Sequence, residues 1–263
     1  MGTAIAVGFA FIVGIGSPAW HEVLRVGLVA GALLGAASAF NDASDAAFDR
    51  DAHVWRPIPA GLVSVEQALR LAALLAIVAL AVGATLDWRA FLLILVTVVA
   101  AYLYSAQLKP SPFAWIAWSV SFALLPLWVA EGVDAFDDVL WWSFPVGLVA
   151  GLATYMVIKL PDYERDDHDD ARNLLHWMTI DYAVPLSWGA VGALIVVAVA
   201  SANLEELRPE WIIPTVTVAI VLSLTMMGVL FLGVTERRLV WQRWVLSLAI
   251  VAMTLGWLGS IAS

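Results

Sequence analysis

Apolar segments of about 20 residues recur along the chain, and this repetition constrains the fold more than any other feature. A transmembrane helix needs about 20 mostly apolar residues to cross the hydrocarbon core of a bilayer. Only short polar breaks separate the segments, and no low-complexity tract lies between them. The nine predicted transmembrane helices comprise residues 3–20, 23–48, 65–86, 90–108, 112–130, 139–160, 180–201, 211–232 and 240–262.

The composition indicates the same class of protein. The 263 residues are 62% hydrophobic and 13% charged, whereas soluble domains carry roughly 25% charged residues. Fourteen tryptophans are typical of a protein with long membrane–water interfaces. We therefore expect an all-α, polytopic membrane protein with a single embedded domain over residues 1–263. Because the chain has no cysteine, disulfides and thiolate chemistry are excluded.

The basic residues predict the orientation. Nine spans place alternate loops on opposite sides of the membrane. Ten of the 13 basic residues then fall on one side, and the other side has only Arg25, Arg89 and Arg208. Lys and Arg are enriched in cytoplasmic loops. We therefore expect a plasma-membrane protein whose N-terminus and ten-residue basic side face the cytoplasm. The net charge of −9 is not that of a nucleic-acid-binding protein, which would be basic.

A stripe of oxygen-bearing side chains ends the second predicted helix. Asn41, Asp45 and Asp49 are spaced i, i+4, i+8, and Asp42 precedes Asp45 by three residues, so a helix places them on one face. Aligned carboxylates repel one another unless a positive group lies among them. Charged residues in membrane helices are functional candidates, and hard oxygen ligands suit Mg²⁺. These four residues, the first stripe, are therefore predicted metal ligands.

A second acidic cluster ends the sixth predicted helix on the same side of the membrane. Asp162, Asp166 and Asp170 repeat the i, i+4, i+8 spacing and are predicted metal ligands as well. Two such clusters in one pocket would hold two metal ions bridged by a diphosphate, whose charge requires them.

Basic residues near both clusters are candidates for holding phosphate. Arg56 follows the first stripe in a loop that two prolines stiffen, and its planar guanidinium can bind a phosphate through two hydrogen bonds. Lys109 ends the fourth predicted helix in the segment that begins at Tyr104, and Lys159 precedes the second cluster. We expect Arg56 and Lys109 to be catalytic. The expected substrate-binding residues are Arg56, Lys109, Lys159 and Tyr104.

These motifs resemble those of the UbiA superfamily of intramembrane prenyltransferases. The matching segments are Asn41-Asp42-xx-Asp45-xxx-Asp49, Arg56-Pro57-Ile58-Pro59-x-Gly61, Tyr104-Ser105-xx-Leu108-Lys109 and Asp162-xxx-Asp166. Their order and separations agree with the family over essentially the whole chain. The second motif departs from it, because Asp170 stands where the family often has glycine and Asn173 where it often has threonine.

The resemblance implies nine helices around a central cavity with a cytoplasmic cap. It implies that the two Asp motifs bind Mg²⁺-diphosphate, while Arg56 and Lys109 hold phosphate oxygens. The implied reaction is Mg²⁺-dependent transfer of an isoprenyl group from a prenyl diphosphate to a lipophilic acceptor, with release of pyrophosphate. Phe40 or Tyr104 would stabilise the allylic cation, and small residues such as Gly151 would set the depth of the cavity.

The acceptor and the alternatives stay open at this point. The acceptor could be a quinone precursor, a chlorin or haem, a glycerol phosphate lipid or a carotenoid end group. A terpene cyclase of the same fold would use the same metal site without an external acceptor. A cation-coupled transporter would also place acids in membrane helices, although transporter acids lie near the bilayer midplane and these lie near helix ends.

Overall fold

The structure is a computed structural model that describes residues 19–47, 49, 54, 56–160, 173–204, 207–231 and 236–261. Most of the predicted first helix, residues 3–20, lies outside these ranges. The three aspartates of the second cluster, Asp162, Asp166 and Asp170, lie outside them as well.

Every regular element in the described ranges is helical, which confirms the all-α prediction. Eight helical spans there are long and apolar enough to cross a membrane. The long helices are α2 (Trp20–Ser44), α4 (Val65–Gly83), α5 (Trp88–Leu103), α6 (Ala114–Gly132), α7 (Ser143–Lys159), α9 (Leu174–Leu204), α10 (Pro209–Phe231) and α11 (Glu236–Ile261). A π-helix, η1 (Tyr104–Leu108), extends α5, and a 3₁₀ helix, η2 (Asp138–Trp142), precedes α7.

The outward side chains of these helices are those of a lipid-facing surface. Ile77 of α4, Val196 of α9 and Leu224 of α10 are 62%, 66% and 58% exposed, and many other large apolar side chains are exposed with them. Soluble proteins rarely expose contiguous apolar patches larger than a few hundred Å². The described helices therefore require a bilayer around them.

Local polar groups fix where the helices begin. Before α4, the backbone N–H of Gln67 donates to Ser64 Oγ at 3.1 Å, and the backbone N–H of Ser64 donates to Gln67 Oε1 at 2.8 Å. This reciprocal capping box satisfies two donors at the helix start. The α9 helix begins at Leu174, six residues earlier than the predicted residue 180, because Asn173 accepts a hydrogen bond from the backbone N–H of Leu175.

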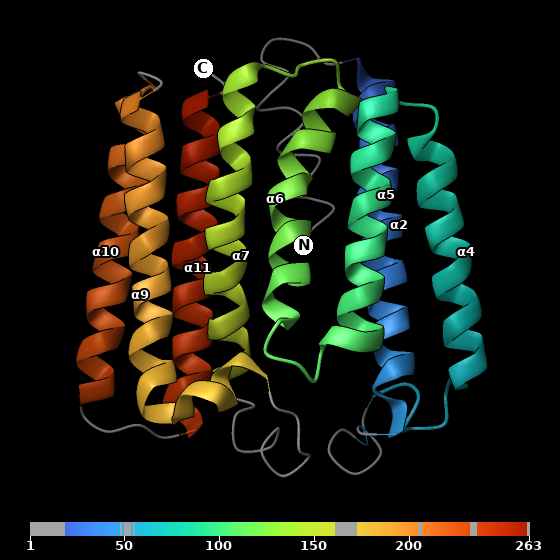
Figure 1. The fold of residues 1–263 in the computed structure, drawn as a ribbon, viewed down its shortest axis with the longest axis horizontal. Coiled ribbons are helices and arrows are strands. Elements are labelled where there is room, and N and C mark those ends of the chain that lie inside the picture. Colours follow the sequence, from blue (N-terminus) through green and yellow to red (C-terminus); the bar gives the residue numbers. More distant parts are fainter. Residues whose placement is uncertain are drawn as a thin grey trace. The chain divides into compact units, whose positions relative to one another are not determined.

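The chain divides into two compact units, residues 1–108 with 127–136 and residues 109–126 with 137–263. In the first unit α2, α4 and α5 lie side by side (Figure 1). In the second unit α7 packs against α9 and α11, and α10 packs against α11 (Figure 1). The first unit contains the first stripe, Arg56 and Tyr104, whereas Lys109 and Lys159 belong to the second.

Two glycines of α7 allow close packing within the second unit. A Cβ atom on Gly147 would lie 2.5 Å from the Ala123 Cα of α6, and one on Gly151 would lie 2.8 Å from the Ser119 Cβ. Glycines four residues apart are a common device for bringing membrane helices together. The expectation that Gly151 lines a substrate cavity is therefore wrong, because this residue faces the backbone of a neighbouring helix.

Buried polar contacts join α9 to α11 in the same unit. The indole N–H of Trp257 donates to Ser201 Oγ at 2.8 Å, and Gln242 Nε2 donates to Ser187 Oγ at 3.1 Å. All four residues are at most 1% exposed. Hydrogen bonds between membrane helices contribute a modest stabilisation, about 0.6 kcal/mol on average, and they fix the register of the two helices.

Candidate functional site

The first stripe lies at the end of α2, where the helix continues past its last regular turn. The backbone N–H of Asp45 donates to the Asn41 carbonyl at 2.9 Å, and that of Asp49 donates to the Asp45 carbonyl at 2.8 Å. These successive i to i+4 bonds realise the spacing predicted from the sequence. Asn41, Asp45 and Asp49 therefore share one helical face.

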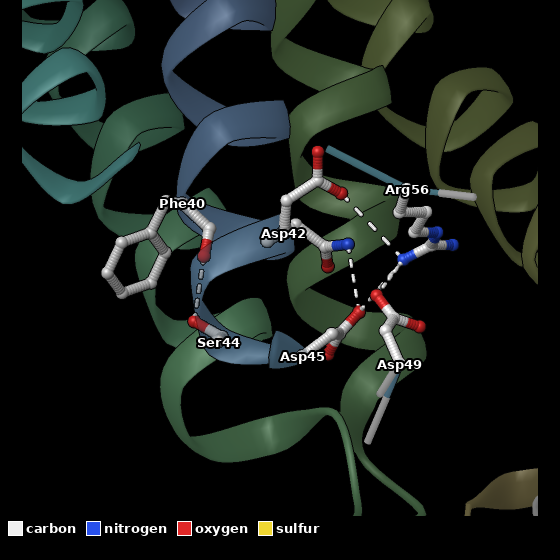
Figure 2. A network of polar contacts seen from close by, with 7 residues as sticks. Phe40, Asp42, Ser44, Asp45, Asp49 and Arg56 are labelled. Atoms are coloured by element: carbon white, nitrogen blue, oxygen red, sulfur yellow. Dashed lines mark hydrogen bonds and ion pairs between the residues drawn. The ribbon is translucent and has the colours of Figure 1, made fainter. Parts of the chain in front are cut away.

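The guanidinium of Arg56 lies among the three carboxylates of this stripe (Figure 2). Its Nη1 donates a hydrogen bond to Asp49 Oδ2 and lies 3.7 Å from Asp42 Oδ1 and 3.9 Å from Asp45 Oδ2. The structure thus supplies the positive group that three aligned carboxylates require. Arg56 thus has carboxylate partners at three positions of the first stripe.

The carboxylates differ in their exposure to solvent. The side chain of Asp42 is 40% exposed, that of Asp45 18% and that of Asp49 only 6%. Arg56 itself is 27% exposed. Because a charge-assisted contact strengthens as water is excluded, the contact with Asp49 is the strongest of the three.

A tightly folded loop begins at Arg56. The backbone N–H groups of Ala60 and Leu62 donate to the carbonyls of Arg56 and Pro57, each at 2.9 Å. Gly61 has a φ of 73°, a backbone conformation that glycine adopts without steric cost. The Arg-Pro-Ile-Pro-x-Gly sequence therefore forms a tight turn that begins at Arg56 and precedes α4.

The donor chemistry of the first stripe fits Mg²⁺, although the described residues do not form a finished metal cage. Asn41 Nδ2 donates to Asp45 Oδ2 at 3.1 Å, so an amide and three carboxylates gather within two helical turns. Hard oxygen ligands of this kind, completed by water and phosphate, suit Mg²⁺. In the part of the chain that the structure describes, however, no three acidic or histidine side chains are placed to hold one ion.

Phe40 does not accompany the stripe. Its ring packs against Tyr102 of α5 with the ring centroids 5.3 Å apart, and in Figure 2 it points away from Arg56. The expectation that Phe40 stabilises an allylic cation is therefore not supported.

An open groove of about 510 Å³ lies at the same end of α2, lined by Ala43, Ser44, Ala46, Ala47, Ile58, Pro59 and Val65. None of these side chains is ionisable, so the groove lining offers no carboxylate or imidazole ligand.

Tyr104 opens the π-helix η1, which the sequence did not predict. The predicted helix ran regularly to residue 108, whereas the α-helical part ends at Leu103. The η1 segment lies against α2 within the first unit. Single π turns in α-helices are frequent at functional sites, and this one coincides with the Tyr104–Leu108 motif.

The remaining predicted site residues lie in the second unit. Lys109 follows η1 directly, and Lys159 is the last residue of α7; both are half-buried. Asn173 is 1% exposed and caps α9 directly after the second motif. The departure from threonine at this position therefore keeps a side chain that favours helix N-caps.

Comparison with known proteins places the chain in a family. The model of the UbiA prenyltransferase family matches residues 1–226. A digeranylgeranylglyceryl phosphate synthase from Pyrococcus horikoshii is 28% identical over 163 residues, which are 60% of this chain and 57% of that protein. The chain thus aligns with little more than half the length of this relative.

Solved structures share the fold. A UbiA homologue from Aeropyrum pernix K1 has a TM-score of 0.78 at 15% identity, covering 97% of this chain and 94% of that chain. A UbiA homologue from Archaeoglobus fulgidus, bound to GPP and Mg²⁺, has a TM-score of 0.69 at 18% identity, covering 97% and 95%. At these identities the similarity establishes the fold alone, and the chemistry has to be argued from the residues of the site.

Proposed function

Because the chain belongs to the UbiA prenyltransferase family, we propose that it is a Mg²⁺-dependent intramembrane prenyltransferase. It transfers an isoprenyl group from a prenyl diphosphate to a lipophilic acceptor and releases pyrophosphate. The observation that carries the proposal is the gathering of Arg56 and three aspartates at one end of a membrane helix. Charged groups are costly there and are retained for function.

The proposed roles follow the chemistry of the side chains. Asn41, Asp42, Asp45 and Asp49, together with Asp162, Asp166 and Asp170, supply oxygen ligands for Mg²⁺. When bound, Mg²⁺ neutralises the diphosphate and makes it a better leaving group. Arg56, Lys109 and Lys159 hold phosphate oxygens through charge-assisted hydrogen bonds, and Tyr104 binds the substrate beside them.

The reaction balances without a redox partner. The bond between the allylic carbon and the diphosphate oxygen breaks, and both electrons leave with the diphosphate. A nucleophilic atom of the acceptor then bonds to the allylic carbon, and its proton passes to solvent. The cationic side chains act where negative charge develops on the leaving group, and an apolar surrounding keeps water from the allylic cation.

A glycerol phosphate lipid is the acceptor class we propose first. The support is the activity for which the Pyrococcus horikoshii relative is named. In such a lipid a free hydroxyl would be the nucleophile. We also propose that the Arg56 end of α2 faces the cytoplasm of a cell membrane, since ten of the 13 basic residues fall on that side.

The proposal is tested by pyrophosphate release from the purified protein in lipid nanodiscs. The assay contains Mg²⁺ and geranylgeranyl diphosphate, with and without a geranylgeranylated glycerol phosphate. Wild type is compared with Asp45→Ala, Asp49→Ala and the surface control Glu66→Gln, whose side chain is 74% exposed. We expect release that requires Mg²⁺ and acceptor and is unchanged in the control. It should fall at least about tenfold in both aspartate variants, since even second-shell changes at metal sites cost about 10–100-fold.

Other outcomes identify the alternatives. Release without acceptor, accompanied by a cyclic hydrocarbon in mass spectrometry, would indicate a terpene cyclase. Release that requires a membrane extract in place of the glycerol phosphate would retain prenyl transfer and replace the acceptor. No release with any prenyl diphosphate of five to twenty carbons would refute the enzymatic proposal.

A further inference from the structure

We infer that Arg56 is an internal counter-ion that competes with Mg²⁺ for the first stripe, so that metal and diphosphate load together. The inference rests on the proposed function, since it concerns how the same site is filled. It adds an order of events: metal alone binds weakly, and the diphosphate strengthens metal binding by drawing Arg56 away from the carboxylates.

Arg56 supplies positive charge at the centre of the first stripe. One guanidinium nitrogen lies within 4 Å of an oxygen of Asp42, Asp45 and Asp49. A metal ion using the same carboxylate oxygens would stand within a few ångströms of this guanidinium. Two cations at such a distance repel each other strongly where water is scarce, and the side chain of Asp49 is only 6% exposed. Arg56 and a fully ligated metal ion therefore exclude each other from these oxygens.

A displaced Arg56 needs a new anionic partner. Removing a guanidinium from a half-buried carboxylate is costly unless it gains an equivalent partner. A diphosphate offers several anionic oxygens, and the guanidinium fork matches phosphate geometry as well as carboxylate geometry. When the diphosphate arrives, Arg56 exchanges one anionic partner for another, and the carboxylates exchange Arg56 for the metal. Neither group passes through an unpaired state.

This exchange makes the binding of metal and diphosphate mutually dependent. If the diphosphate raises the affinity for the metal, the metal must raise the affinity for the diphosphate by the same factor. A site that binds metal alone only weakly also keeps its carboxylates paired with Arg56 between turnovers. The role of Arg56 is therefore double: it holds phosphate in the loaded site and neutralises the first stripe in the metal-free site.

The test measures binding of Mn²⁺ alone, by electron paramagnetic resonance of the free ion, to the whole protein in nanodiscs. The Arg56→Gln variant lacks the competing charge, so we expect it to bind Mn²⁺ about tenfold or more tightly than wild type. The matched control is Arg70→Gln. Arg70 carries the same charge in the same unit but pairs with Glu66 at an exposed position, with both side chains over 70% exposed. This control should leave Mn²⁺ affinity unchanged.

A second arm adds inorganic pyrophosphate. In wild type it should raise the affinity for Mn²⁺, and in Arg56→Gln the rise should be much smaller, because the exchange partner is gone. Arg56→Lys keeps one positive charge without the planar fork and should bind Mn²⁺ with intermediate affinity. This variant allows the inference to be tested even if Arg56→Gln does not fold. Combining Arg56→Gln with Asp45→Asn should abolish the gain.

The outcomes separate the two proposals. Equal or weaker Mn²⁺ binding by Arg56→Gln, with pyrophosphate-dependent binding intact in wild type, would overturn the counter-ion inference and leave the proposed function standing. A gain that survives Asp45→Asn would also overturn it, because the ion would then lie elsewhere. Absence of Mn²⁺ binding in wild type even with pyrophosphate would instead contradict the proposed metal-dependent function.

Discussion

The backbone N–H of Leu175 donates a hydrogen bond to Asn173 Oδ1 at 2.9 Å, and both residues are buried. This bond starts α9 directly after the second acidic cluster. Replacing an N-cap residue with alanine costs about 1 kcal/mol. We therefore expect Asn173→Ala to lower the thermal unfolding midpoint, whereas Asn173→Thr, which restores a capping oxygen, should lie close to wild type. Equal losses in both variants would show that the stabilisation by Asn173 does not come from its capping oxygen.

The contact of α7 with α6 gives a second prediction. A side chain at Gly151 would collide with Ser119, and overpacking costs about 1–3 kcal/mol. We expect Gly151→Val to destabilise the protein by that amount in chemical unfolding. Gly192→Ala is the matched control, because nothing lies within 4 Å of a Cβ there and alanine favours a helix. If Gly151→Val were as stable as this control, the two helices would not be in close contact.

The hydrogen bond between Trp257 and Ser201 gives a third prediction, on stability. Both side chains are buried, and Ser201→Ala leaves the indole N–H without its acceptor. We expect a loss of about 0.6 kcal/mol, and at most about 1.7 kcal/mol. A double-mutant cycle with Trp257→Phe should give a coupling of similar size, measured by unfolding in detergent. A coupling of zero would mean that the hydrogen bond contributes nothing to stability.

Lys109 and Lys159 give a fourth prediction, on substrate binding. Each ammonium is proposed to bind phosphate oxygens, and a hydrogen bond to a charged group contributes about 1.5–3 kcal/mol. We expect Lys109→Gln and Lys159→Gln to lower kcat/KM for the prenyl diphosphate about 10- to 100-fold. Arg243→Gln is the control, since Arg243 lies 5.4 Å from the ring centroid of Trp244 and has no proposed role in the reaction. Unchanged kinetics in either lysine variant would remove that residue from the site.

Hydropathy predicted the helices of the described ranges because burial in lipid requires long apolar segments. It missed the first turns of α9, where Trp177 is 79% exposed and Asn173 supplies the starting signal. A capping side chain acts over one turn, so an average over about 20 residues does not register it. The start of α4, with Ser64 and Gln67 in a local capping box, coincides with its predicted start.

In the candidate site, too, local features could be predicted from the sequence and tertiary contacts could not. The spacing of Asn41, Asp45 and Asp49 predicted their common face, because periodicity is a local property of the helix. The partners of Arg56 could not be predicted, since a contact between side chains seven or more residues apart depends on tertiary structure and not on local periodicity. Sequence placed this arginine soon after the acids, and the structure brings its guanidinium within 4 Å of all three carboxylates.

The π turn at Tyr104–Leu108 has a consequence for how this segment responds to change. A π turn accommodates one residue more than an α-helical turn, and each residue rotates an α-helix by about 100°. Losing a single residue here would therefore convert the π turn to an α-helical turn that rotates the chain by nearly the same angle, and the side chains that follow would keep their direction. The turn thus absorbs one residue, and a one-residue deletion within Tyr104–Leu108 should disturb the protein less than a deletion in the regular part of α5, which would rotate every later side chain by about 100°.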